Sequence, residues 1–225
     1  ITEQIALYHS KSLLGIHITD IPYHHILAYP PDKLSDEEKK YLDAVTNWQM
    51  TEGAFNMIQS TKPQTVAYGL NDSPVGLAAW IVEKFHTWSD SHGDIESCFT
   101  KDELLTNITI YWATQTINSS FRLYHEAMKD MMQEMYNPLT KLNPFDKTGN
   151  KTEVPTAVAK FKTDLLPSKE FASKFFNIQQ WTEMPRGGHF AAMEQPELLV
   201  DDMRKFVNDI LLQSQSGRFL EKIHG

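Results

Sequence analysis

A chain of 225 residues, with 41% hydrophobic and 22% charged residues, is long enough to bury a sizeable core in one or two domains. Its formal net charge of -8 argues against a nucleic-acid-binding surface, which requires a basic patch. No apolar run reaches the roughly 18 residues that indicate a transmembrane helix. Cys98 is the only cysteine, so an intrachain disulfide is impossible; this suits a reducing compartment and predicts a cytoplasmic protein.

The first residues show the spacing of a helix, with Ile1, Ile5 and Tyr8 on one face. A short apolar run from Leu14 to Thr19 then predicts a buried strand. A chain seldom opens within a helix beside a lone buried strand, so we expect a further segment before Ile1. We assign residues 1–27 to the first part of an α/β core.

The middle of the chain, residues 28–150, is predicted to be mainly helical. Ser35, Ser73 and Thr100 are N-cap candidates, and the first and third have a glutamate three residues later, which is the capping-box spacing. Apolar spacing predicts single long helices in two segments, residues 34–59 and 99–132. The segment YNPLTKLNPFDKTGN, rich in Pro, Asn and Gly, predicts a linker at the end of this region.

The last region, residues 151–225, changes pattern. VPTAVAKF predicts a buried strand, KTDLLPSKEFASKFF a helix, IQQWTEM a second strand, PRGGH a loop and ELLVDDMRKFVNDILL a final helix. This order is typical of an α/β sheet. The predicted fold class is therefore α/β, with two core pieces flanking an inserted helical lid over the carboxyl ends of parallel strands.

His189 follows two glycines in the loop after the last predicted strand. Such a loop opens onto the ligand edge of the sheet, and the glycines predict a flexible hinge that lets the imidazole reach a cleft. Imidazole titrates near neutral pH and can take a proton from water, so His189 is a candidate general base. The alternative is a turn histidine without a catalytic role.

A general-base histidine works better when a carboxylate fixes its tautomer and stabilises the imidazolium. Asp164 follows the strand VPTAVAKF on the same edge of the sheet, and it precedes His189 in the order acid, then histidine, that α/β-hydrolases use. Asp20, after the first strand, is an alternative partner. Asp164 could instead cap the following helix.

Other candidates have weaker signals. Tyr124, late in a lid helix, could hydrogen-bond an oxygen that develops negative charge, or it could be a half-buried aromatic. His24 and His25 are adjacent, so we expect their rings to point in different directions and make a poor metal pair, while His17 on a strand reads as a satisfied core residue. Without HExxH, paired CxxC or GxGxxG motifs, no metal or other cofactor is expected.

A nucleophile is missing from the sequence. No G-x-S-x-G motif and no glycine-flanked aspartate at a strand-to-helix elbow is present, and Cys98 lies just before a lid helix. The chain thus contains a candidate base and acid, but not the group that would attack a substrate.

Several long blocks resemble the microsomal-type epoxide hydrolase family, which has the α/β-hydrolase fold. They are IQSTKPQTVAYGLNDSPVGLAAWIVEKFHTWSD, DELLTNITIYWATQTINSSFRLYHEA, VPTAV and RGGHFAAMEQPELLVDDMRKF. The resemblance implies an aspartate nucleophile that opens the epoxide to a covalent ester, which water then hydrolyses to a vicinal diol. By matching position, it makes His189 the base, Asp164 its acid and Tyr124 a lid tyrosine.

The chain departs from this family in two places. The position of a second lid tyrosine is held by Phe55, which has no hydroxyl group. The family's nucleophile elbow would fall just before Ile1, since ITEQIALYH resembles the helix that follows it. The expected partners are therefore a small-molecule epoxide and an N-terminal fragment of the same protein.

Two other activities stay open from the sequence. Lid tryptophans can bind halide, so Trp80, Trp88 and Trp112 leave haloalkane dehalogenation open, while Tyr124 favours epoxides. Ester hydrolysis is the other alternative. We expect Trp112 and Phe55 to contact the substrate. A non-catalytic relative that retains the lid is the third possibility, against which the presence of both His189 and Asp164 speaks.

Overall fold

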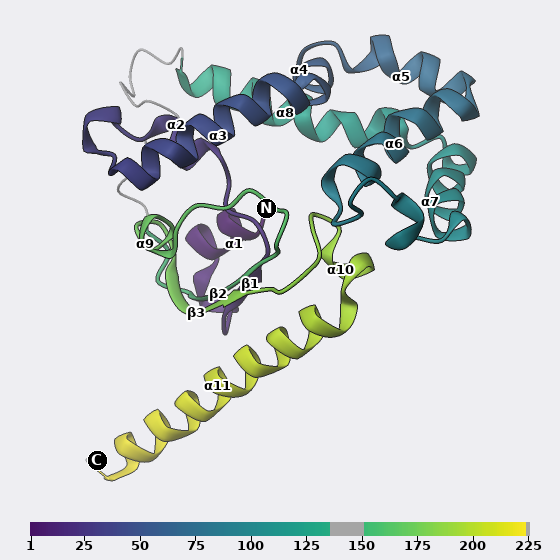
Figure 1. Cartoon of the computed structure of the whole chain (residues 1–225). Helices are drawn as coiled ribbons and strands as arrows, with labels where there is room; N and C mark the ends of the chain where they lie inside the picture. The colour runs from purple at the N-terminus through teal and green to yellow at the C-terminus, as the bar shows by residue number, and fades with distance from the viewer. Residues whose placement is uncertain (136–150, 224–225) are drawn as a thin grey trace. The chain divides into compact units, whose positions relative to one another are not determined.

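The computed structural model describes residues 1–135 and 151–223, which divide into two compact units (Figure 1). The first unit contains Ile1–Pro22 and the chain from Thr148 onward, and the second contains Tyr23–Lys147. The sequence placed these boundaries after residues 27 and 150. The predicted linker at residues 136–150 lies outside the described residues.

The first unit is built on a parallel sheet of three strands. Its strands are β1 (Ile16–Ile18), β2 (Pro155–Lys160) and β3 (Asn177–Glu183), in that order across the sheet. The four inner residues of β2 are buried because neighbouring strands flank β2 and helices cover the sheet. The predicted α/β class is confirmed, and each predicted strand is present.

Among its described residues, four α-helices complete this unit. They are α1 (Thr2–Tyr8), α9 (Lys169–Ala172), α10 (Ala191–Glu194) and α11 (Pro196–Ile223). Figure 1 shows α1 and α11 on opposite sides of the strands. The long helix predicted after β2 is wrong: only the four residues of α9 are helical, and they begin where the Ser168 hydroxyl accepts a hydrogen bond from Phe171 N at 3.3 Å.

A buried polar network joins α11 to the sheet. His17 Nε2 donates to Asp202 Oδ2 at 2.8 Å, and only 8% and 5% of these two side chains is exposed. Thr182 Oγ1 donates to the other carboxylate oxygen at 2.6 Å, and Gln180 Nε2 donates to the Asp202 carbonyl at 3.1 Å. His17 is thus a satisfied core residue, as predicted, and β1, β3 and α11 are joined through one carboxylate.

The second unit is helical. Its helices are α2 (His24–Ala28), α3 (Asp36–Glu52), α4 (Ala54–Thr61), α5 (Pro63–Asp72), α6 (Pro74–Trp88), α7 (Lys101–Thr114) and α8 (Ile117–Met135). Short 3-10 turns cover Ser10–Ser12 in the first unit, and Pro31–Lys33 and Ile95–Ser97 in the second. All three predicted N-caps are confirmed, and Ser35 and Thr100 each form a complete capping box with the glutamate three residues on.

Two predicted long helices are each broken into two. Gly53 separates α3 from α4, and a Cβ atom there would lie 2.4 Å from the Gln49 carbonyl oxygen, so the position excludes any side chain. Gln115 ends α7 with φ 54°, a left-handed conformation, and its N–H bonds back to Trp112 and Tyr111. The apolar pattern continues across both breaks, which is why it did not reveal them.

The core of this unit lies where its helices pack together. Helices α4 and α5 pack against α8, and α6 packs against α7. One buried cluster consists of Ala67, Leu70, Leu77, Ile108, Ile117 and Phe121, with Trp80 and Trp112 partly buried against it. Within the two described ranges, no helix combines the length and the apolar character needed to cross a bilayer.

The Asp202 network predicts a large loss of stability when its carboxylate is removed. In Asp202→Ala, His17 and Thr182 keep buried donors without an acceptor, and the free energy of unfolding should fall by about 3 kcal/mol. Hydrogen exchange of the β1–β3 amides measures the loss and assigns it to this unit.

Asp201→Ala is the matched control. Asp201 is the preceding residue of the same helix, with an exposed 3.4 Å ion pair to Arg204, so its loss should leave exchange in the strands nearly unchanged. Equal effects of the two substitutions would show that the network does not stabilise the sheet.

Candidate active site

The loop after β3 carries His189. The strand's hydrogen bonding ends with Met184 N donating to the Lys160 carbonyl at 2.8 Å, and the chain then turns through Gly187 at φ +97°. A Cβ atom at Gly187 would lie 2.7 Å from the Phe161 ring and 2.8 Å from Gln195 Cγ. Glycine is required here both by the backbone conformation and by the packing.

The Glu194 carboxylate fixes the two backbone amides that flank His189. Gly188 N donates to Glu194 Oε2 at 3.1 Å, and Phe190 N donates to Oε1 at 3.0 Å. Glu194 belongs to α10 and is buried. The bidentate carboxylate thus holds the loop on both sides of His189, and the flexible hinge stays a prediction. Sequence reasoning missed Glu194, whose only signal was an acidic residue among small and apolar ones.

His189 and Asp164 are paired. His189 Nδ1 lies 3.4 Å from Asp164 Oδ1, with 44% of the histidine side chain and 14% of the aspartate side chain exposed. Asp164 N bonds to the Phe161 carbonyl at 3.2 Å, and Thr163 N bonds to the Gly187 carbonyl at 3.3 Å, which ties the two loops together. Ser168, not Asp164, caps α9, so the capping alternative for Asp164 is wrong.

The charge environment favours protonated His189. The hydrogen bond with Asp164 raises the pKa of the imidazole; partial burial opposes this, and the negative charges of Asp164, Asp20 and Glu194 add to the rise. Nδ1 is the ring nitrogen directed to Asp164. The pair has the arrangement of a general base with an orienting acid.

Asp20 follows β1 and belongs to the same electrostatic group. Asp20 as a whole residue is exposed. Protein atoms nevertheless surround its carboxyl group, and this desolvation, together with the charge of Asp164, raises the pKa of Asp20 to about 6. The charge of His189 and a hydrogen bond from Ile21 N act in the opposite direction. Both acids that the sequence offered as partners for His189 therefore interact with it.

In the second unit, Tyr124 and Phe55 lie together in a cluster of aromatic side chains. Their ring centroids are 6.0 Å apart in an edge-on arrangement. Phe55 also contacts the Trp88 ring at 5.2 Å, and Lys84 Nζ lies 5.4 Å from the Phe55 centroid and 5.2 Å from that of Trp88. The two positions that the sequence assigned to lid tyrosines are thus neighbours.

Tyr124 is only partly exposed. Desolvation, followed by the proximity of Tyr111, raises the pKa of its hydroxyl, so the group stays protonated and can donate a hydrogen bond at neutral pH. Trp112, the other predicted substrate contact, packs against the buried cluster of Leu77 and its neighbours. The tryptophan ring that lies beside Phe55 is that of Trp88.

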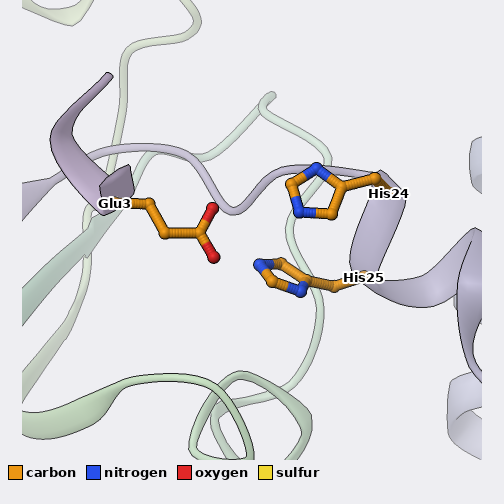
Figure 2. Close-up of side chains that lie close together, drawn as sticks. All are labelled: Glu3, His24 and His25. Carbon is orange, nitrogen blue, oxygen red and sulfur yellow. The ribbon is translucent and has the colours of Figure 1, made fainter. Parts of the chain in front are cut away.

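His24 and His25 begin α2, and Figure 2 shows their rings side by side. The ring centroids are 4.2 Å apart with an angle of 45° between the planes, so the prediction that they point in different directions is wrong. Glu3, also labelled in Figure 2, belongs to the other unit.

Comparison with known proteins gives one consistent result. The chain is 35% identical over 207 residues to a putative epoxide hydrolase of Stigmatella aurantiaca, covering 91% of this chain and 43% of that protein. It is 43% identical over 175 residues to epoxide hydrolase 1 of Sus scrofa, covering 74% and 36%. The chain therefore spans less than half the length of these relatives. No protein-family sequence model matches it.

Solved structures agree. The crystal structure of juvenile hormone epoxide hydrolase from the silkworm Bombyx mori superposes with a TM-score of 0.73 at 27% identity. The match covers 94% of this chain and 52% of the silkworm chain. The three parallel strands and the helices described above thus correspond to part of a larger α/β-hydrolase fold.

The Glu194 contacts predict how the histidine loop responds to substitution. In Glu194→Gln, one of two charged acceptors becomes an amide donor, so the Gly188 and Phe190 amides should exchange with solvent at least about tenfold faster. Hydrogen exchange followed by NMR measures this. Glu197→Gln, an exposed change three residues away on α11, should leave both amides protected, and equal protection in the two variants would exclude this role for Glu194.

Proposed function

Because this chain belongs to the microsomal-type epoxide hydrolase family, we propose that it takes part in hydrolysing an epoxide to a vicinal diol through a covalent alkyl-enzyme ester. The observation that carries the proposal is the His189–Asp164 pair at 3.4 Å, on loops after neighbouring strands of an α/β-hydrolase sheet. A partly exposed imidazole oriented by a carboxylate suits a step in which water must lose a proton.

In the proposed first step, an aspartate carboxylate attacks an epoxide carbon, and the bond from that carbon to the ring oxygen breaks. The oxygen gains negative charge and takes a proton from Tyr124. The raised pKa of Tyr124 keeps its hydroxyl protonated until this charge develops. Such a donor acts mainly in the transition state, where the negative charge is greatest.

In the second step, His189 takes a proton from water, and the resulting hydroxide attacks the ester carbonyl. The bond between the carbonyl carbon and the alkyl oxygen breaks, the departing alkoxide takes the proton of the attacking hydroxide to complete the diol, and the aspartate carboxylate is regenerated. Asp164 stabilises the imidazolium that forms, and the proton returns to the tyrosine oxygen. Because His189 must be neutral to accept a proton, the rate of this step should rise with pH through the pKa of the imidazole.

In this proposal, the nucleophile comes from residues outside these 225. A glycine-flanked aspartate at a strand-to-helix elbow is absent from the sequence, and the relatives are more than twice as long as the part matched here. We propose that a segment of the same protein supplies this aspartate. The cytoplasmic location and the contact of Trp112 with substrate stay predictions.

Substitution of the base tests covalent catalysis. In the full-length protein, His189→Gln should still open the epoxide but fail to hydrolyse the ester, so the alkyl-enzyme should accumulate while diol formation falls by about 100-fold or more. Intact-mass spectrometry under denaturing conditions detects the added mass of one substrate, and peptide mapping locates it.

The adduct is expected on an aspartate outside residues 1–225. His86→Gln, a change of an exposed histidine on α6, is the matched control and should turn over without accumulating an adduct. Absence of any adduct in His189→Gln, with epoxide consumed, would rule out the covalent route.

Phe55 tests the lid. Phe55→Tyr restores a second hydroxyl beside Tyr124, and ring opening should accelerate by about tenfold or more, since one donor to a developing oxyanion is worth about 10²–10³ in rate. Single-turnover ester formation measures this step.

Tyr124→Phe and the double exchange Phe55→Tyr/Tyr124→Phe complete the set. The single variant should lose about 100-fold in ring opening, and the double exchange should recover part of that loss. No gain in Phe55→Tyr and no recovery in the double exchange would mean that position 55 cannot reach the epoxide oxygen.

A further inference from the structure

Three neighbouring strands each deliver a titratable side chain at their carboxyl ends. Asp20 follows the last residue of β1, Ile18, by two positions; Asp164 follows β2, and His189 follows β3. Because the strands are parallel and lie in the order β1-β2-β3, these ends meet at one edge of the sheet. The mechanism above uses Asp164 and His189 and leaves Asp20 without a role.

The hydrogen bond between Asp164 and His189 is long. At 3.4 Å, the Nδ1–Oδ1 distance lies beyond the usual 2.7–3.2 Å for N–H···O bonds. Orientation and charge stabilisation of the imidazolium by Asp164 alone are therefore weaker than in a short, well-aligned pair. A second negative charge nearby would supply part of what this contact lacks.

Asp20 provides such a charge. Its carboxyl lies close enough to His189 and Asp164 for the charges of both to act on it. The charged groups that act on His189 are Asp164, Asp20 and Glu194. Of the two acids that supplement Asp164, Glu194 is already bonded to the Gly188 and Phe190 amides, which leaves Asp20 as the acid not used by the loop.

We propose that Asp20 is a second acid of His189, a positioning residue that shares the imidazolium with Asp164 and maintains part of its stabilisation when Asp164 is lost. The catalytic role of Asp20 rests on the proposed function. Its electrostatic effect on the His189 imidazole does not. The inference implies two carboxyls around one base, with the negative charge of Asp164 acting on Asp20.

The coupling has a direct consequence for pH. Burial and the charge of Asp164 hold the pKa of Asp20 near 6, so Asp20 is neutral in mildly acidic solution and ionised above it. As pH rises through this value, the second negative charge appears beside His189 and favours the imidazolium. Ester hydrolysis should therefore show a dependence on Asp20 near pH 6, in addition to the titration of His189 itself.

NMR titration of the His189 imidazole in the full-length protein tests this without substrate. Asp20→Asn should lower the imidazole pKa, Asp164→Asn should lower it, and the double variant should lower it further than either. Asp20→Glu should restore most of the native value. The control is Asp201→Asn, which removes the same charge from an exposed site on α11 and should have no effect.

Single-turnover ester hydrolysis supplies the second readout. Asp164→Asn should retain measurable hydrolysis, and Asp20→Asn/Asp164→Asn should fall by about tenfold or more below it. If no variant, including the native protein, hydrolyses an epoxide, the proposed function fails while the imidazole titration still decides the role of Asp20. If Asp20→Asn matches Asp201→Asn in the titration, the second-acid inference is overturned, whatever the activity.

Discussion

Parallel pairing of β1, β2 and β3 is the constraint on which the rest of the first unit depends. It brings three loops from distant parts of the chain to one edge, where Asp20, Asp164 and His189 interact. Antiparallel pairing would send alternate loops to opposite edges and separate the acid from the base. The register in which β1 and β3 pair with the buried strand β2 therefore decides which side chains share the site.

Features set by nearby residues could be predicted from the sequence. The capping boxes at Ser35 and Thr100 require only a glutamate three positions on, and a helix start brings these groups together whatever the rest of the chain does. Strand positions were equally local, because short apolar runs bounded by polar residues favour buried strands. Placing Asp164 and His189 after such strands made Asp164 a candidate partner, while Asp20, after the first strand, stayed open as the alternative.

Features set by contacts between distant residues could not be predicted from the sequence. The Glu194 carboxylate bonds two amides only because Gly187 turns the loop back toward α10, and nothing in its neighbours signals an acceptor. The same holds for Asp202, whose partners His17 and Thr182 lie on two strands. The helix breaks at Gly53 and Gln115 could not be predicted, because the apolar spacing continues across both positions although the helix ends there.

The His17–Asp202 bond also bears on the order in which the molecule can be assembled. Its partners are 185 residues apart, so during synthesis β1 emerges long before the residue that completes its polar contacts. The helical unit, by contrast, is one continuous segment inserted between β1 and β2, and its contacts can form while the sheet is still incomplete. The helices of the second unit can therefore fold before the sheet that carries the base is complete.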